Sequence, residues 1–388
     1  MKIYLVGGAV RDQLLDLPVS ERDWVVVGAT SEQMVAQGFR PVDAEFPVFL
    51  HPETGDEYAL ARTEEKTGPG YKGFRVEHGP EITLEQDLLR RDLTINALAK
   101  DEAGALVDIC SGREDLDKGL LRHITPAFAE DPVRLLRIAR FAAKLGRWGF
   151  RVAHSTHWLM KQMATSPDLA HLKPERVWRE MTRAMEEDQP WRFFEVLHAC
   201  GALIRMMPEV DQTLGQSSDA HKGGQDPAAV SALKRAVGLT EESTIRIGVF
   251  FYYAANESER PDLWLKSLRA ERDVIQLLKD LLSVNGNIPA TQDCRGLLDL
   301  VGGLNPLQQP LRYRCFLLAA EALWPDVLAQ HKIALATASQ VLATKPPATL
   351  YQQGLQGKAL GDALWDWRVA ELCKRLQAVA GKVDEGGS

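Results

Sequence analysis

Cysteine is scarce in this sequence of 388 residues, and long apolar runs are missing from it. The five cysteines are widely spaced, and none belongs to a CxxC pair: Cys110, Cys200, Cys294, Cys315 and Cys373. Their odd number and scatter predict reduced thiols in a cytoplasmic protein and argue against a zinc site. No apolar run approaches the ~20 residues that a membrane-spanning helix needs, and the N-terminus lacks a signal-peptide pattern. We therefore expect no membrane partner.

The sequence also lacks an excess of positive charge. Lysine and arginine together number 46 and aspartate and glutamate 53, which gives a formal net charge of −7. This balance argues against broad, nonspecific attachment to nucleic acid, but it permits a local basic surface. The positions of the arginines therefore carry more information than their number.

Strand patterns are confined to the N-terminal third of the chain. Short apolar segments predict strands at 2–6, 24–27, 47–50, 57–61 and 95–99. Helical patterns lie between some of these strands, at 10–17 and 84–91. After Glu130 amphipathic helical patterns prevail, interrupted at 215–227 by a polar, glycine-rich segment that indicates a linker.

This order of elements predicts an α+β fold in three parts. The first is a small head with a mixed sheet and helices, at 1–127. A helical neck follows at 128–212, and an all-helical body and tail occupy 213–388. The chain is long enough for each part to bury a core.

Two acids flank a cation just before the apolar run at 24–27. In extended backbone, Glu21 and Asp23 project to the same side about 6.6 Å apart, and Arg22 points away. Two such carboxylates can bind one or two magnesium ions, and two-metal sites catalyse in-line displacement at phosphorus. The alternative is a pair of solvated acids at the end of a strand. The residues around the pair therefore decide between these two interpretations.

A glycine pair lies upstream of these acids. Gly7 and Gly8 join the first predicted strand to a helix, and glycine there lets backbone N–H groups approach phosphate oxygens. Arg11, in the first turns of that helix, can contact a phosphate or a sugar. Beside an acid pair, such a turn predicts one wall of a nucleotide pocket, although a tight connection alone would look the same.

Three long motifs, in this order, resemble the class II tRNA nucleotidyltransferases, the CCA-adding enzymes of the polymerase β-like group. The motifs are "LVGGAVRD…ERDWVVVG", "RRDLTINALA" at 90–99 and "EDPVRLLRIARF" at 130–141. The resemblance covers about residues 1–210. It implies template-independent addition and repair of the 3′-terminal CCA of tRNA from CTP and ATP, with Mg2+ as cofactor. The implied partner is the acceptor stem and 3′ end of tRNA, and no protein partner is predicted.

The resemblance also implies roles for residues of the head. The catalytic and metal-binding acids would be Glu21 and Asp23, with Glu57 as a third catalytic carboxylate. Nucleotide contacts in the head are expected from Gly8, Arg11 and Arg91, with Asp92 in the same motif as Arg91. The segment that contains Asp108 and Gly112 is expected to couple the movements of head and neck.

In the neck, the resemblance makes Glu130, Asp131 and Arg134 part of a motif that replaces a template. A carboxylate such as Asp131 can accept from the exocyclic amine of cytosine or adenine while Arg134 donates to the ring nitrogen. Guanine and uracil present the wrong complement, which leaves polar groups unpaired. Arg137 and Arg140 follow as further nucleotide contacts.

Cations recur every three or four residues after this motif. They predict a basic stripe on one helix face, formed by Arg134, Arg137, Arg140, Lys144, Arg147 and Arg151. The stripe would follow the triphosphate or the tRNA acceptor end, and its alternative is a solvated face. A second helical pattern, at 174–187, carries Arg176, Arg179 and Arg183 and is interpreted as a stabilising helix of the neck.

One departure from the family is Glu21, since the family has aspartate at that position. The extra methylene moves the carboxylate, so Asp23 is the safer metal ligand. Residues 62–81 hold four glycines without periodicity and predict a mobile loop, which favours full CCA addition. Beyond residue 200 only His221 and His331 occur, so we expect no phosphohydrolase site and a body that grips tRNA.

Three other functions fit parts of the sequence. A bacterial poly(A) polymerase shares the head motifs, but we would expect a basic C-terminal extension where this chain ends "AGKVDEGGS". A specialist that adds only CC or only A shares the motifs as well. A tRNA-binding protein with an inactive head is the third, and Glu21 is its support.

Overall fold

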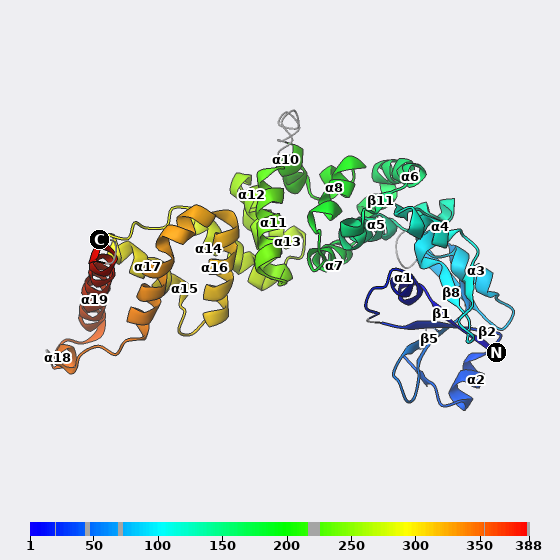
Figure 1. Ribbon diagram of the computed structural model, residues 1–388, viewed down its shortest axis with the longest axis horizontal. Helices are drawn as coiled ribbons and strands as arrows, with labels where there is room; N and C mark the ends of the chain where they lie inside the picture. Colours follow the sequence, from blue (N-terminus) through cyan, green and yellow to red (C-terminus); the bar gives the residue numbers. More distant parts are fainter. Residues whose placement is uncertain (20, 43–46, 69–72, 216–225, 353, 386–388) are drawn as a thin grey trace. The chain divides into compact units, whose positions relative to one another are not determined.

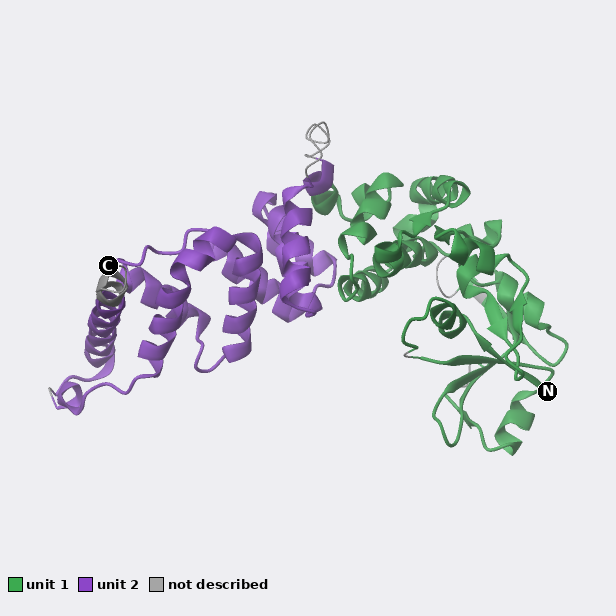
Figure 2. Cartoon of the chain, in the orientation of Figure 1, with its two compact units in different colours: residues 1–211 green, residues 212–388 purple. Residues whose placement is uncertain are grey.

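The computed structural model describes residues 1–19, 21–42, 47–68, 73–215, 226–352 and 354–385. The chain forms two compact units, Met1–Asp211 and Gln212–Ser388 (Figure 2). The predicted head and neck both lie in the first unit, and their boundary at 127/128 stays a prediction. The linker predicted at 215–227 lies largely outside the described residues.

A seven-stranded mixed sheet is the centre of the head (Figure 1). Its strand order is β3-β4-β5-β2-β1-β8-β9. The strands are β1 (Lys2–Val6), β2 (Asp23–Val27), β3 (Arg40–Pro41), β4 (Val48–Leu50), β5 (Glu57–Leu60), β8 (Leu98–Lys100) and β9 (Leu106–Asp108). The central pair β2 and β5 is parallel, and the other pairs are antiparallel. The predicted α+β class is confirmed.

Strand β2 is apolar because both faces of the sheet are covered. Val25 packs in a core with Val6 and Leu88, whereas Val26 packs in a second core with Met34. Met34 comes from α2 (Ser31–Ala36) and Leu88 from α3 (Leu84–Leu89), so a helix covers each face. A strand buried on both faces is a continuous apolar run rather than an alternating one.

The other elements of the first unit are mostly helical. Around the sheet lie α1 (Gly8–Leu14), η2 (Thr94–Asn96), α4 (Gly112–Asp117) and η3 (Pro126–Glu130). They are followed by α5 (Val133–Leu145), η4 (Gly146–Trp148), α6 (His154–Thr165), η5 (Pro167–His171), α7 (Pro174–Met185), α8 (Trp191–Ala199), α9 (Leu203–Met206) and α10 (Pro208–Gly215). Helix α5 packs against α7 and α8, and its Leu135, Ile138, Ala139 and Ala142 are buried.

Two predictions for this unit are wrong. Residues 62–81 are not a loop throughout, because β6 (Arg62–Lys66) and β7 (Phe74–His78) pair as an antiparallel hairpin around residues 69–72, which lie outside the described chain. Charged side chains on both strands hid the strand pattern. The strand predicted at 95–99 begins later, because η2 occupies the first part of that segment and β8 the second.

The basic stripe is also shorter than predicted. Helix α5 ends at Leu145, so Arg147 lies in η4 and Arg151 in β11 (Arg151–Val152). Strand β11 pairs in parallel with β10 (Leu120–Leu121) as a separate two-stranded ribbon. Gly149, with a φ of 79°, follows η4 and turns the chain into β11. The helical period therefore does not connect the last two cations to the first four.

The second unit is helical throughout its described elements. They are α11 (Ala228–Leu239), α12 (Ser243–Glu257), α13 (Pro261–Ser267), α14 (Arg272–Val284), α15 (Cys294–Leu304), α16 (Pro310–Leu323), α17 (Pro325–Ala343), α18 (Ala348–Tyr351) and α19 (Gly357–Glu385). Among the described residues, no helix is long and apolar enough to cross a membrane.

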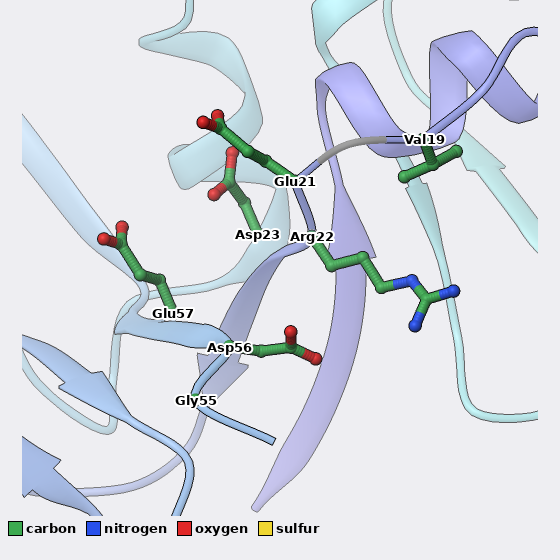
Figure 3. Close-up of a pocket in the computed structure, with 7 residues that line it drawn as sticks. All are labelled: Val19, Glu21, Arg22, Asp23, Gly55, Asp56 and Glu57. Atoms are coloured by element: carbon green, nitrogen blue, oxygen red, sulfur yellow. The ribbon is translucent and has the colours of Figure 1, made fainter.

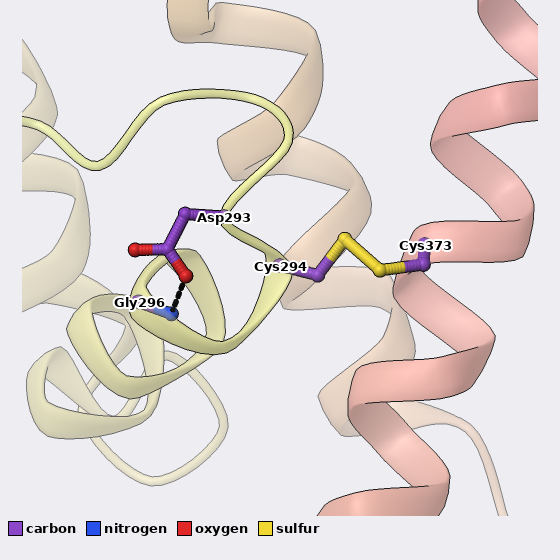
Figure 4. Close-up of a disulfide and its surroundings, with 4 residues drawn as sticks. All are labelled: Asp293, Cys294, Gly296 and Cys373. Atoms are coloured by element: carbon purple, nitrogen blue, oxygen red, sulfur yellow. Dashed lines mark hydrogen bonds between the residues drawn. A yellow bond between two sulfur atoms is a disulfide. The ribbon is translucent and has the colours of Figure 1, made fainter.

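A disulfide joins α15 to α19, contrary to the prediction of five reduced thiols. Cys294 and Cys373 are bonded with Cα atoms 5.7 Å apart (Figure 4). The bond closes a separation of 79 residues, which in the chain-entropy model stabilises the folded state by about 4 kcal/mol. The other three cysteines are free. Spacing in the sequence could not reveal the pair, because its partners meet only through the packing of α19 on α15.

Candidate active site

Three carboxylates gather where β2 and β5 begin. Asp23 and Glu57 are Cα partners in this parallel pair, so their side chains leave neighbouring strands at the same level. Figure 3 shows the carboxylates of Glu21, Asp23 and Glu57 directed to one side, whereas Arg22 and Asp56 point to another. These residues, with Val19 and Gly55, line a cavity of ≈ 500 Å³, which we call the carboxylate pocket.

The local backbone differs slightly from the prediction. Strand β2 begins at Asp23, so Glu21 lies in the irregular segment before the strand rather than on it. The alternation of side chains nevertheless holds, because Glu21 and Asp23 point together and Arg22 does not (Figure 3). Asp56 accepts a hydrogen bond of 3.4 Å from Trp24 Nε1, which accounts for its different direction.

The environment of Asp23 disfavours its ionised form. Burial raises the pKa of the Asp23 carboxyl above its ordinary value, Arg91 opposes that rise, and the nearby Glu21 carboxylate adds to it. A carboxylate that is partly desolvated and repelled by a second acid gains from a bound cation. The electrostatics of the pocket therefore favour a positively charged ligand.

Arg91 connects this pocket to the glycine turn. Its Nη2 donates to Asp87 Oδ2 over 3.1 Å, and Asp87 is fully buried, so the guanidinium is held in place. A Cβ added at Gly7 would lie 2.8 Å from Arg91 Nη1, and Gly7 has a φ of +70°. Only glycine fits there. The turn and Arg91 thus form one wall near Asp23, with Gly8 as the first residue of α1.

Arg11 is a buried member of a hydrogen-bonded network. Its side chain forms an ion pair of 2.7 Å with Asp12, and its Nη1 donates to Asn96 Oδ1 over 2.6 Å. Asn96 Nδ2 in turn donates to Asp92 Oδ1 over 2.9 Å. The residue is 3% exposed, so its contacts in this state are with the protein. Its expected contact with a sugar or phosphate stays a prediction.

Asp92 joins the head to the neck. Arg137 Nε on α5 donates to Asp92 Oδ2 over 2.7 Å, and the Leu93 N–H donates to Asp92 Oδ1 over 2.8 Å. Burial by itself raises the pKa of Asp92, but Arg137, Asn96 and the backbone donor outweigh it and hold that pKa well below its usual range. The bond between Asp92 and Arg137 is therefore a charged link between a head motif and the first neck helix.

Two further cations of α5 also face carboxylates. Arg140 pairs with Glu180 of α7 over 2.9 Å, and Lys144 pairs with Asp12 of α1 over 3.2 Å. Beyond the helix, Arg147 pairs with Asp188 over 2.7 Å. The predicted basic stripe is thus largely neutralised within the first unit, and much of its charge fixes α5 to α1 and α7.

Asp131 and Arg134 lie together at the start of α5. Asp131 Oδ1 accepts from the Val133 N–H over 3.0 Å and lies 3.7 Å from Arg176 Nη1. Arg134 donates to two backbone carbonyls, that of Arg90 over 2.8 Å and that of Ala127 over 3.4 Å. Both side chains are oriented by these contacts. Among the described residues the second oxygen of Asp131 has no hydrogen-bond donor, and a guanidinium has five N–H groups, so each can still bind a base edge.

Asp108 has a local structural task. Its carboxylate accepts from the backbone N–H groups of Cys110, Gly112 and Arg113 over 3.2, 2.9 and 2.9 Å, which caps the start of α4. A Cβ at Gly112 would lie 2.3 Å from the Thr94 carbonyl oxygen, so glycine is required. Whether this segment couples head and neck stays a prediction.

Four residues of this region were not singled out from the sequence. Asp12 and Asn96 lie inside the quoted motifs, and Asp87 lies three and four residues before Arg90 and Arg91, a spacing that favours ion pairs on a helix. Phe141 is the fourth. The guanidinium carbons of Arg11, Arg137 and Arg140 lie 5.1, 5.8 and 4.7 Å from its ring centroid. Such clustering is a product of the fold and leaves no local signal.

The carboxylate pocket fits magnesium better than a protein-bound transition metal. Within the described chain, no group of three or more His, Cys, Asp or Glu side chains is close enough to form a metal cage. Magnesium is usually held by one or two carboxylates, with substrate phosphates and water as the other ligands. Glu21 and Asp23, with Glu57 beside them, supply oxygen ligands of this type.

Comparisons with known proteins find similar sequences over nearly the whole chain. Residues 3–122 match a family model described as "Poly A polymerase head domain", and residues 149–214 match "Probable RNA and SrmB- binding site of polymerase A". A "Multifunctional CCA protein" of Thioalkalivibrio sulfidiphilus is 44% identical over 409 residues, which covers 97% of this chain and 99% of that protein. A "CCA-adding enzyme" of Pseudomonas putida is 44% identical over 381 residues, covering 96% of this chain and 98% of that protein.

Solved structures agree on the fold. The Bacillus stearothermophilus CCA-adding enzyme in complex with CTP matches with a TM-score of 0.66 over 99% of this chain and 94% of that chain. A complex of a CCA-adding enzyme with ATP matches with a TM-score of 0.66 over 100% of this chain and 91% of that chain. Both are 22% identical to this chain, so the likeness concerns the arrangement of the elements.

Proposed function

The chain belongs to the family of CCA-adding tRNA nucleotidyltransferases, and we propose that its carboxylate pocket transfers CMP and AMP from CTP and ATP to the 3′ end of tRNA. The observation that supports this site is the common direction of Glu21, Asp23 and Glu57 (Figure 3). Relatives that match nearly the whole chain are named for CCA addition. The substrate is the acceptor stem and 3′ end of tRNA in the cytoplasm.

In this reaction the 3′ oxygen of the RNA forms a bond to the α-phosphorus, and the bond from that phosphorus to diphosphate breaks. Glu21 and Asp23 would hold magnesium, and Glu57 would accept the proton that leaves the 3′ hydroxyl. When bound, magnesium neutralises the triphosphate and lowers the pKa of the attacking hydroxyl. Arg91, fixed by Asp87 beside the Gly7–Gly8 turn, orients the triphosphate.

Base selection is assigned to Asp131 and Arg134. The free oxygen of Asp131 accepts from the exocyclic amine, and Arg134 donates to the adjacent ring nitrogen, an arrangement shared by cytosine and adenine. Because the backbone carbonyls of Arg90 and Ala127 hold Arg134, its remaining N–H groups have a fixed direction. Arg137 and Arg140 act by positioning α5 rather than as free nucleotide contacts.

A transcript of tRNA that lacks CCA, end-labelled and incubated with CTP and ATP separately and together, tests the function. We expect two additions with CTP alone, three with both, and then arrest. With both nucleotides present, continued addition of A would identify a poly(A) polymerase. Arrest after CC, or addition of A alone, under the same conditions would identify a specialist.

A pair of variants tests the site itself. Asp23→Ala should abolish magnesium-dependent incorporation of labelled CMP. Asp56→Asn is the matched control, because Asp56 lines the same pocket but points away from the three carboxylates and bonds Trp24. If wild-type protein binds tRNA but incorporates nothing, the head is inactive and the proposal is wrong.

A further inference from the structure

The distribution of acids along the chain is uneven in the neck. From Val133 to Pro167 the sequence has no aspartate or glutamate, although the whole chain has a formal net charge of −7. This stretch forms α5, η4, β11 and α6. Three of its α5 cations, Arg137, Arg140 and Lys144, are neutralised by acids from elsewhere in the first unit. Two cations that follow α5 in this stretch are not paired with an acid.

Arg151 on β11 and Lys161 on α6 have no carboxylate within ion-pair distance in the part of the chain that the structure describes. Both side chains belong to exposed residues. Arg151 lines a hollow of ≈ 640 Å³ that shares no residue with the carboxylate pocket. Arg122, His154, Ser155 and His157 also line it. Leu120, Val152 and Ala153 complete the lining, so the hollow combines two guanidinium groups and further hydrogen-bond donors with apolar surface, which suits a phosphate and the sugar attached to it.

The side chain of Arg122 is held in an orientation that leaves part of its guanidinium able to bind a ligand. Its Nε faces the buried Asp115 over 3.0 Å, which fixes the guanidinium while 41% of the side chain stays exposed. Among the described residues no bond is made by its two terminal nitrogens, so their N–H groups remain to bind an anion. A guanidinium held by one carboxylate and open at its other edge is suited to phosphate.

Trp158 adds an aromatic surface next to the hollow. It is 59% exposed, which is high for so large an apolar side chain. On α6 it lies four residues after His154 and three before Lys161, so the three share one helix face. Burial, Lys161 and His154 all lower the pKa of His157, which is consistent with these cationic groups being neighbours.

We propose that Arg122, Arg151, His154, His157, Trp158 and Lys161 form a second substrate-binding surface, which we call the α6 surface. It takes the sugar–phosphate backbone of RNA in the hollow and stacks a base on Trp158. Cationic grooves combined with exposed aromatic rings are typical of proteins that bind nucleic-acid strands. A protein interface would instead be expected to have an apolar centre without such charge. The proposal rests on tRNA being the substrate.

The matching family description calls residues 149–214 a probable RNA-binding region and names no side chain. The α6 surface specifies the contacts and divides them into two kinds. Arg151 and Lys161 act through phosphates, so their removal should change the salt dependence of binding. Trp158 acts by stacking, so its removal should not.

Binding of a tRNA transcript lacking CCA, measured by fluorescence anisotropy over a range of salt concentrations, tests both kinds of contact. For Arg151→Gln combined with Lys161→Gln, we expect the slope of log Kd against log salt to fall by about 2, one per cation. For Trp158→Ala we expect Kd to rise at least about fivefold with the slope unchanged, and Trp158→Phe should restore most of the affinity. KM for tRNA should rise in parallel while kcat stays near that of the wild type.

Arg147→Gln is the matched control, because Arg147 belongs to the same acid-free stretch but is paired with Asp188. It should leave Kd and the salt slope unchanged, and thermal unfolding should confirm that all variants fold. Unchanged binding in the double variant and in Trp158→Ala would overturn the α6 surface even if CCA addition is intact. Failure of wild-type protein to add nucleotides, with these binding effects present, would instead count against the proposed function alone.

Discussion

Asp23 and Asp92 are acids of the same unit in opposite electrostatic situations. Asp23 lies in the carboxylate pocket, where burial and Glu21 raise its pKa and Arg91 only partly opposes them. Asp92 is buried too, but Arg137 and two further donors hold its pKa below the ordinary range. Among the described residues, Asp23 has no ion-pair partner within 4 Å, whereas both carboxylate oxygens of Asp92 are bonded. Asp23 is thus suited to bind a cation from solution, and Asp92 fixes the neck to the head.

The two situations have opposite consequences for stability. An acid whose folded-state pKa is raised costs stability when ionised, and the cost disappears as the pH falls through that pKa. An acid whose folded-state pKa is lowered contributes stability above its unfolded-state pKa, and that contribution is lost as the pH falls. Charge in the carboxylate pocket thus lowers stability and serves function, a common relation at active sites.

The largest effect is expected for Asp23→Asn. Nucleotide incorporation should fall at least about a thousandfold, the equivalent of about 4 kcal/mol, because a neutral amide is a poor ligand for magnesium. The free energy of unfolding should stay equal or rise, since the substitution removes repulsion from Glu21. Rates of labelled CMP incorporation and urea unfolding of the same preparations measure the two. If Asp23→Asn is less stable than the wild type but still active, Asp23 stabilises the fold and is not a catalytic ligand.

Asp92→Asn should show the opposite profile. We expect a loss of about 2 kcal/mol in the free energy of unfolding of the first unit, because Arg137 loses a charged partner that is 6% exposed. The amide oxygen can keep the bonds from Leu93 and Asn96, but the amide NH2 cannot accept from Arg137. Because Asp92 does not line the carboxylate pocket, activity per folded molecule should fall far less than for Asp23→Asn. Urea unfolding followed by tryptophan fluorescence measures the loss. Complete inactivation of a fully stable variant would show that Asp92 takes part in the chemistry.

The pH dependence of these variants sharpens the contrast, with a smaller effect than the two losses described above. Asp23→Asn should gain on the wild type at pH 8 and lose that advantage as the pH falls toward 4, because wild-type Asp23 becomes protonated early. The deficit of Asp92→Asn should persist to about pH 4 and shrink only below it. Urea unfolding at a series of pH values checks both directions. Parallel pH curves for the two variants would contradict the assigned pKa directions.

The parts of the fold and of the carboxylate pocket that depend on local sequence pattern could be predicted from the sequence. The apolar run at 24–27 indicated the strand, and alternation indicated that Glu21 and Asp23 project together. Both signals are local, because side-chain direction in a strand or helix depends on position along the chain. Arg91 and Asp131 were considered only because their motifs resemble those of a known family.

Pairing between distant residues could not be predicted in the same way. The cations of α5 suggested a free basic face, but Asp12, Asp92 and Glu180 come from other elements and neutralise it. The hairpin at 62–78 was missed because its charged side chains give no apolar alternation, and the partners of its backbone lie across the turn. The Cys294–Cys373 bond depends on helix packing over 79 residues. Each of these features requires the tertiary fold.

The smallest effect is expected where a cation of the predicted stripe lies in the open. Arg147 and Asp188 form an ion pair of 2.7 Å, but their side chains are 53% and 52% exposed. Exposed pairs contribute about 0.5 kcal/mol, because water and salt screen the attraction and both side chains lose freedom. A double-mutant cycle of Arg147→Gln with Asp188→Asn should give a coupling energy of that size at low salt.

The same cycle at about 0.5 M salt separates the two kinds of pair. The Debye length is then about 4 Å, close to the separation of the two charges, so the coupling between Arg147 and Asp188 should fall by about half. The coupling between Arg137 and Asp92 should largely persist, because Asp92 is 6% exposed and its field passes through protein rather than water. Equal salt sensitivity of the two cycles would mean that the Asp92–Arg137 link is open to solvent. The charge on α5 would then be available to a substrate, as the sequence alone had suggested, instead of being committed to holding neck and head together.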